Sequence, residues 1–155
     1  LDAMEHGKSV VTANKAVVAT CWEELDAAAR ANGVGFYYEA AVAGGIPVIG
    51  VLNRSMQANR IQEILGIVNG TTNAILTDME EGMSYAAALA NAQAQGYAEP
   101  NPTSDVSGQD AAYKLCILAS LAFGQRVRVE DIQQEGITSI TSGTGSGASG
   151  SKSGR

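Results

Sequence analysis

Apolar residues recur at helical spacing in several parts of the chain. The segment "CWEELDAAARANG" predicts a helix closed by Gly33, because its apolar residues lie three and four positions apart: Trp22, Leu25, Ala28 and Ala29. The segments "TTNAILTDMEEG" and "SYAAALANAQAQG" predict two further helices, each ended by glycine. Thr71 or Thr72 is expected to cap the first of these, and Ser84 the second.

A long segment from Gly108 to Phe123, "GQDAAYKLCILASLAF", is almost uncharged. Its apolar positions leave almost no polar stripe, so we expect a helix that is buried on most faces. Asp110 and Lys114 are four residues apart in this segment and therefore lie on one face of the predicted helix.

Short apolar runs predict strands. They occur in "VGFYYEAAV", at residues 65–68 and in "EGITSIT", while Pro47 suits the first turn of a short helix. The pattern predicts an α+β fold with a mostly antiparallel or mixed sheet, built from the Phe36, Arg60 and Gly136 segments and covered on one face by the helices at 71–95 and 108–123. Because such apolar strands need both faces buried, we expect a homodimer through the uncovered face.

The composition is that of a one-domain globular protein, with 155 residues, 45% of them hydrophobic and 17% charged. Basic residues are scattered and the net charge is −6, which argues against a nucleic-acid partner. No apolar run reaches the roughly 18 residues that a membrane helix requires. Cys21 and Cys116 each lie in an apolar helical pattern, where a buried free thiol is the expected state. We therefore expect a soluble cytoplasmic protein with no membrane or nucleic-acid partner.

Two features that look like functional motifs have better explanations. Gly145, Gly147 and Gly150 match the GxGxxG pattern of dinucleotide-binding loops, but they lie in the Ser/Gly-rich stretch 142–155. No room remains there for the helix on which pyrophosphate binding depends, and we expect a disordered tail. His6, the only histidine, lies at a predicted helix end with no cysteine near it, so a metal or triad role is not expected.

The stretch "GYAEPNPTSDVSGQDAAYK" gathers three acidic residues and one lysine: Glu99, Asp105, Asp110 and Lys114. Glu99 and Asp105 are predicted to lie in a proline-punctuated loop that leads into the 108–123 helix. We expect the carboxylates to converge at the start of that helix, where the helix dipole favours anions by roughly 0.3 to 1 kcal/mol. They could hold a substrate ammonium, and a desolvated lysine one turn along could act as an acid or a base. A surface ion pair between Asp110 and Lys114, worth about 0.2 to 0.5 kcal/mol, is the alternative that spacing alone favours.

Four segments together resemble the catalytic and dimerisation domain of homoserine dehydrogenases, in order and at the family's spacing: "GKSVVTANKA", "EAAVAGGIPVI", "GIVNGTTNAILTDME" and "GYAEPNPTSDVSGQDAAYKL". The resemblance runs from Gly7 to Ile140. That family interconverts L-homoserine and L-aspartate 4-semialdehyde with NAD or NADP, in the pathway to threonine, methionine and isoleucine. The resemblance implies these substrates and cofactors, and a homodimer, for this chain.

The resemblance also implies roles for four residues of the substrate pocket. Lys114 matches the family's proton-transferring lysine, and Asp110 matches a substrate-binding aspartate that orients it. Glu99 matches the carboxylate that binds the homoserine amino group, and Asp105 matches another acidic residue of that pocket.

Two further residues match the cofactor side of the family's site. Gly96 falls where the family brings its backbone close to the nicotinamide. Lys15 matches a second lysine, at the junction of cofactor and substrate. Without the resemblance, a solvated lysine at a helix start would be the preferred interpretation of Lys15.

Members of the family bind a monovalent cation, typically sodium, through a glutamate and backbone carbonyls in the turn that "EAAVAGG" resembles. The matching positions in this chain are Glu39, Val42, Gly44 and Ile46. Oxygen-only ligation suits a hard cation. The equally economical alternative is that Glu39 caps the glycine turn.

The resemblance implies three parts: residues 1–20 as the last helix and strand of a nucleotide-binding domain, 21–141 as the catalytic and dimerisation domain, and 142–155 as the tail. We therefore expect a fragment that lacks most of its cofactor platform and is inactive alone. A truncated, non-enzymatic dimerisation module is the main alternative, and an amino-acid dehydrogenase with another substrate is a weaker one.

Overall fold

The computed structural model describes residues 1–141, which divide into two units, each built around its own hydrophobic core. The first unit comprises Leu1–Val68 and Asp110–Gln134, and the second comprises Asn69–Gln109 and residues 135–141. Helices dominate both units, and the first also holds a small sheet, so the α+β class predicted from the sequence is confirmed. The predicted tail at 142–155, with its three glycines of the GxGxxG pattern, lies outside the described residues.

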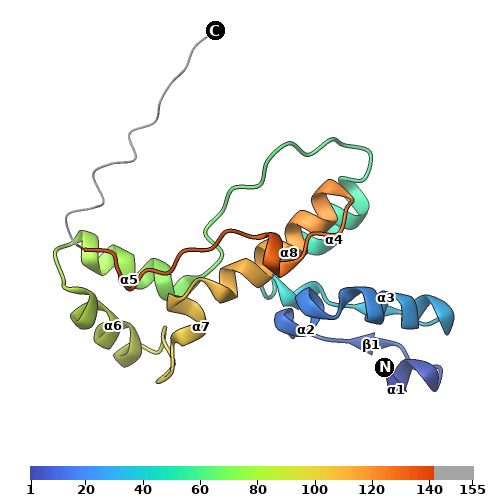
Figure 1. Cartoon of the computed structure of the whole chain (residues 1–155), viewed down its shortest axis with the longest axis horizontal. Coiled ribbons are helices and arrows are strands. Elements are labelled where there is room, and N and C mark those ends of the chain that lie inside the picture. Colours follow the sequence, from blue (N-terminus) through green and yellow to red (C-terminus); the bar gives the residue numbers. More distant parts are fainter. Residues whose placement is uncertain (142–155) are drawn as a thin grey trace, which may run out of the picture. The chain divides into compact units, whose positions relative to one another are not determined.

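The first unit begins with helix α1, which is followed by two strands joined by helices; α1, β1, α2 and α3 are labelled in Figure 1. The strands pair in parallel, with Val10 opposite Phe36. A parallel pair needs a long crossover connection, which the two helices between the strands provide. The elements are α1 Asp2–Glu5, β1 Val10–Val11, α2 Lys15–Thr20, α3 Trp22–Ala31 and β2 Phe36–Tyr37.

The rest of the first unit packs against these elements around one apolar cluster. The remaining elements are the 3-10 helix η1 Glu39–Ala41, α4 Val48–Gly50, the π-helix η2 Val51–Ser55, α8 Gln109–Phe123 and the 3-10 helix η3 Val129–Asp131. The core of the unit is formed by Val18, Ala19, Ala41, Val42, Ile49, Cys116, Ile117 and Leu118. The central turns of α8 therefore lie inside this unit, as the uncharged sequence of the helix predicts.

The second unit is helical, with α5 Gly70–Glu80 and α6 Tyr85–Ala94 side by side and the short α7 Thr103–Val106 following them (Figure 1). Ser84 caps α6 as predicted, because its hydroxyl accepts from the Ala87 amide at 3.3 Å. The core of the unit is formed by Ile75, Met79, Ala88, Ala92, Ala98, Val106 and Ile137.

Two details of the second unit differ from the prediction. Asn69, rather than Thr71 or Thr72, caps α5, since its Oδ1 accepts from the Thr72 amide at 2.8 Å. Asn69 directly precedes the helix, which begins at Gly70, so its side-chain oxygen can accept from a free backbone amide of the first turn. Asn is as good a capping residue as Ser or Asp. Asp105 belongs to α7 and not to a loop.

The strands predicted at the Arg60 and Gly136 segments are not formed within residues 1–141. Residues 60–69 form no helix or strand, and Leu65 and Ile67 have 85% and 79% of their surface exposed. Ile137 instead packs into the second core and donates its amide to the Val106 carbonyl at 2.9 Å. A strand requires a hydrogen-bonding neighbour, which an apolar run in the sequence does not provide by itself.

Both cysteines are free thiols, as predicted. Cys116 is fully buried and Cys21 is half-buried. Within residues 1–141, every helix is too short or too polar to cross a membrane.

Candidate active site

A buried carboxylate lies between two lysines in the first unit. Asp110, in the first turn of α8, keeps only 6% of its side chain exposed. Its Oδ1 is 2.9 Å from the Lys15 ammonium, and its Oδ2 is 2.6 Å from the Lys114 ammonium. Residues from two distant segments of the sequence therefore form one ionic group, in which each carboxylate oxygen contacts one lysine.

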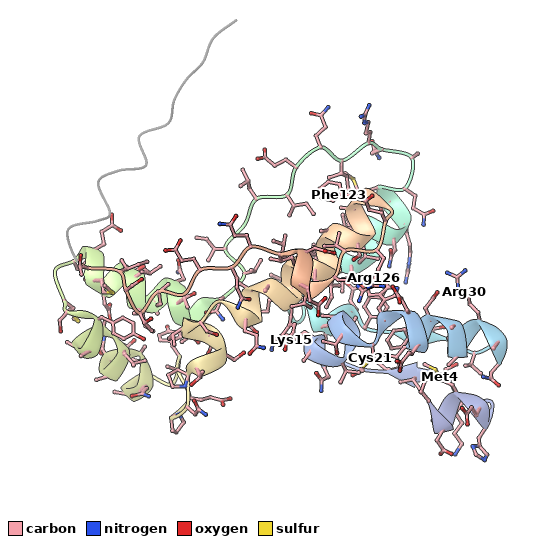
Figure 2. All side chains as sticks on the ribbon, viewed as in Figure 1. Met4, Lys15, Cys21, Arg30, Phe123 and Arg126 are labelled. Carbon is pink, nitrogen blue, oxygen red and sulfur yellow. The ribbon has the colours of Figure 1, made fainter. Side chains whose placement is uncertain are left out.

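Local structure explains how each lysine arrives there. Lys15 is the first residue of α2 and is labelled at the start of that helix in Figure 2. Asn14 fixes this helix start, because its Oδ1 accepts from the Val17 amide at 3.2 Å. Lys114 is one turn beyond Asp110 on α8, and its ammonium also donates to the Val68 carbonyl at 2.6 Å.

This geometry differs from a surface ion pair. The side chains of Lys114 and Lys15 are 18% and 38% exposed, so a carboxylate removed from water is neutralised by one largely buried and one partly exposed ammonium. The three charges sum to +1 when all are ionised. Such a group is suited to hold an electron-rich oxygen of a ligand and to give it a proton.

The other predicted pocket residues belong to the second unit. Gly96 follows α6 with a φ of +79°, a conformation that favours glycine. Glu99 is exposed, and its carbonyl accepts from the Gln93 side chain at 3.2 Å. Asp105 is half-buried, and its Oδ1 accepts from the side-chain amide of Asn69 at 2.7 Å.

Sequence reasoning missed the residues that hold this second group in place. Asn69 is buried, and it both caps α5 and donates to Asp105. Thr71, also buried, donates its hydroxyl to the Tyr97 carbonyl at 2.6 Å, next to Gly96. The segment "NGTT" before an apolar helix was the available signal, because Asn directly before a helix is a strong capping residue.

The "EAAVAGG" turn is built around Glu39. Its Oε1 accepts from the Ile49 amide at 3.0 Å, at the start of α4, and the Ile46 carbonyl accepts from the Val48 amide at 2.8 Å. Ala43 and Gly44 both have positive φ, at +62° and +56°. Capping by Glu39 is thus present in the structure, though at the start of α4. The carbonyl-rich turn also fits a hard monovalent cation, because each engaged oxygen keeps a second lone pair.

Burial shifts the pKa of Tyr38 and of Cys116 in the first unit. Burial raises the pKa of the Tyr38 hydroxyl. Burial also raises the pKa of the Cys116 thiol, and the neighbouring Arg126 partly offsets the shift. Among residues 1–141, no cluster of three or more His, Cys, Asp or Glu side chains could hold a metal ion.

Residues 1–39, which hold the parallel strands and their crossover helices, match the family model described as "Homoserine dehydrogenase, NAD binding domain", and this match places the segment among dinucleotide-binding domains. The family model described as "Homoserine dehydrogenase" matches residues 47–153. This second match covers more than half of the sequence, and the chain belongs to the homoserine dehydrogenase family.

Individual relatives agree with the family models. Homoserine dehydrogenase from Mycobacterium leprae is 56% identical over 142 residues, which are 91% of this chain and 32% of the relative. Homoserine dehydrogenase from Pseudomonas aeruginosa is 53% identical over 143 residues, which are 92% of this chain and 33% of the relative. The chain thus spans about a third of the length of the curated relatives it matches.

Solved structures show the same fold. The crystal structure of a homoserine dehydrogenase from Thiobacillus denitrificans superposes with a TM-score of 0.87 at 48% identity, covering 91% of this chain and 33% of that chain. A hyperthermophilic archaeal homoserine dehydrogenase in complex with NADPH superposes with a TM-score of 0.82 at 35% identity, covering 90% of this chain and 44% of that chain.

Proposed function

We propose that this chain supplies the acid–base lysine and the substrate-binding carboxylates of a homoserine dehydrogenase. The reaction is the interconversion of L-homoserine and L-aspartate 4-semialdehyde with NAD or NADP, in the biosynthesis of threonine, methionine and isoleucine. The observation that carries the proposal is the buried Asp110 carboxylate between Lys15 and Lys114. The two free cysteines support a reducing compartment, the cytoplasm.

The chemistry requires one proton to move at a fixed position. The nicotinamide, when bound, exchanges a hydride with the carbinol carbon of homoserine. Lys114 donates a proton to the aldehyde oxygen in the direction of reduction, and its neutral amine accepts the hydroxyl proton in the direction of oxidation. Asp110 and the Val68 carbonyl hold two of the three N–H donors of this ammonium, which leaves the third to face the substrate.

The remaining residues bind and orient. Lys15, held by the other oxygen of Asp110, acts as a second cation at the junction of cofactor and substrate. Glu99 binds the substrate ammonium, and Asp105, fixed by Asn69, lines the same pocket. Gly96 would let the backbone come close to a bound nicotinamide, because glycine has no Cβ.

A chimeric enzyme tests the proposal directly. In this chimera the chain replaces the segment of the P. aeruginosa homoserine dehydrogenase that it matches, so that the relative contributes the rest of the protein. We expect homoserine-dependent reduction of NAD or NADP by the chimera. A chimera that folds and binds the dinucleotide but leaves homoserine unoxidised would contradict the proposal.

The turn around Glu39 is proposed to bind sodium. The support is its donor set of one carboxylate and turn carbonyls at Val42, Gly44 and Ile46. Sodium chloride should then raise the melting temperature of the chain more than choline chloride at equal ionic strength. Glu39→Gln keeps the oxygen that caps α4 and should abolish that difference.

We propose in addition that the chain pairs as a homodimer, and this is also the basis of the second candidate function, a dimerisation module without catalysis. The specific observation is the 60–69 segment, which forms no helix or strand and exposes Leu65 and Ile67 to solvent. Large apolar side chains next to each other on an unpaired segment are typical of an interface. An inactive chimera that still dimerises would favour this second function.

A further inference from the structure

Arg126 joins the helices of the first unit at a distance from the lysine pair. It follows the end of α8, and Figure 2 labels it between that helix and the α2 and α3 helices. Its Nη2 donates to the carbonyl of Ala19, near the end of α2, at 2.5 Å. The last carbonyls of a helix have no partner within the helix, and a cation is favoured beside them.

The same guanidinium reaches two further elements. It lies over the Trp22 ring of α3, with its carbon 5.5 Å from the ring centroid, which is the distance of a cation–π contact. Its Nη1 is 3.5 Å from the Ser120 hydroxyl and 3.7 Å from the Cys116 sulfur, both on α8. One side chain therefore contacts α2, α3 and α8.

These contacts bear on the active site because α2 and α8 carry Lys15 and Asp110 at their other ends. Lys15 is the first residue of α2, four residues before Ala19, and Asp110 lies in the first turn of α8, ten residues before Ser120. At about 1.5 Å of rise per residue, Ser120 is roughly 15 Å along α8 from Asp110, so Arg126 is well away from the reacting atoms. Helix α2 has only six residues, too few to be stable alone, and its position depends on what holds its ends.

We propose that Arg126 is a positioning residue for the lysine–aspartate group. By holding the end of α2 against α8 and α3, it sets the separation between Lys15 and Asp110. The inference rests on the proposed function for its catalytic consequence, whereas its structural part, the dependence of the Lys15–Asp110 contact on Arg126, does not.

The structural part is tested by a double-mutant cycle on the chain itself. Lys15→Met removes a charge that Asp110 needs, so it should lower the melting temperature of the parent chain. In an Arg126→Met background, where α2 is no longer held, Lys15→Met should lower it much less, because the contact is already lost. Arg128→Met is the matched control: Arg128 pairs with Glu23 at 3.4 Å, and both side chains are largely exposed. Its effect should add to that of Lys15→Met.

The catalytic part is tested in the chimera. A small displacement of a catalytic group can cost up to about 100-fold, so Arg126→Met should lower kcat for homoserine by about 10- to 100-fold. In a chimera that already carries Lys15→Met, Arg126→Met should lower kcat little further. The control Arg128→Met should leave kcat of the parent chimera unchanged. If Arg126→Met does not fold, Arg126→Lys, which keeps a donor for Ala19 but not the planar fork, carries the same comparison.

The outcomes separate the two claims. Additive melting temperatures for Arg126→Met and Lys15→Met would overturn the inference, because Arg126 would then stabilise the fold without setting the contact. So would an unchanged kcat in an active chimera that carries Arg126→Met. A parent chimera without activity, together with strong coupling in the melting temperatures, would sink the proposed function and leave the positioning role supported.

Discussion

Asp110 is the residue on which the electrostatics of the site depend, because its single carboxylate contacts both lysines and carries the only negative charge of the group. Its burial means that water cannot replace either partner at low cost. Breaking a buried pair by removing one member is more damaging than breaking a surface pair, since the remaining charges are left without compensation.

We expect Asp110→Asn to lower the free energy of unfolding by roughly 3 kcal/mol, the lower end of the range for buried pairs, because Lys15 remains partly in water. Asp26→Asn is the matched control. Asp26 pairs with Arg30 at 2.8 Å on the exposed face of α3, and its loss should cost only about 0.5 kcal/mol or less. Urea unfolding of both variants makes the comparison, and equal small losses would mean that the buried group is not stabilising.

Cys116 predicts a pH dependence of stability. Burial raises the pKa of its thiol above the ordinary value of 9.0, so the folded protein keeps this proton at a pH at which the unfolded chain has lost it. The resulting stabilisation is complete below about pH 9 and is lost as the pH rises toward the folded pKa.

Urea unfolding between neutral pH and about pH 10 should therefore show a decline in stability that is smaller in Cys116→Ala than in the parent chain. Tyr38, whose pKa is raised for the same reason, should contribute the part of the decline that remains. Cys21→Ala serves as the control for the loss of a thiol. Identical pH profiles for the parent and Cys116→Ala would refute this assignment.

At the scale of elements, the helices were predictable, whereas of the three strands predicted at the Phe36, Arg60 and Gly136 segments only the one at Phe36 forms within residues 1–141. The Ser84 cap and the glycines that end helices depend on neighbours within a few residues, so the sequence contains most of what determines them. The apolar runs at 65–68 and 136–140 lack a ladder because strand formation depends on a partner elsewhere. The site shows the same difference between local and distant contacts. The spacing of Asp110 and Lys114 is visible in the sequence, whereas Lys15 was expected at the site only because of the family resemblance.

Residues that act between elements were the hardest to find. Asn69 and Arg126 each connect segments that are distant in sequence, through contacts that no local pattern encodes. Asn69 was missed although it lies just before a predicted helix, and nothing in the sequence around Arg126 distinguishes it from an ordinary surface arginine.

Gly136 provides a test of how the last described segment packs. A Cβ at this position would lie 2.8 Å from the Val106 carbonyl, which is backbone and cannot move aside easily. Gly136→Ala should therefore destabilise the chain, by about 1 to 3 kcal/mol as for other overpacked sites. Gly70→Ala is the control, because a Cβ there meets nothing within 4 Å and Gly70 is the first residue of α5. Gly70→Ala should be neutral or slightly stabilising. Thermal unfolding of both variants makes the comparison, and an equally harmless Gly136→Ala would mean that Gly136 does not pack closely against Val106.

At the scale of the whole molecule, each unit has a core of its own, while the relatives are about three times as long as this chain. The exposed Leu65 and Ile67 belong to the first unit and are the basis of the proposed pairing. Light scattering at micromolar concentration should report a dimer of the parent chain. Replacing both residues by Asp should shift it toward the monomer, whereas Met83→Asp, a change at another exposed apolar residue, should not. A monodisperse monomer of the parent chain would rule out pairing of this chain alone.

The most direct test of the account is the turnover of the chimera with Lys114→Met, which keeps the aliphatic stem of the side chain and removes the amine. Positioned proton transfer contributes about 10² to 10⁴ in rate, so kcat for homoserine should fall by that factor, with dinucleotide affinity and folding retained. Near-normal kcat together with a lower melting temperature would contradict the account. It would mean that Lys114 only neutralises Asp110, and that the proton is carried by another group.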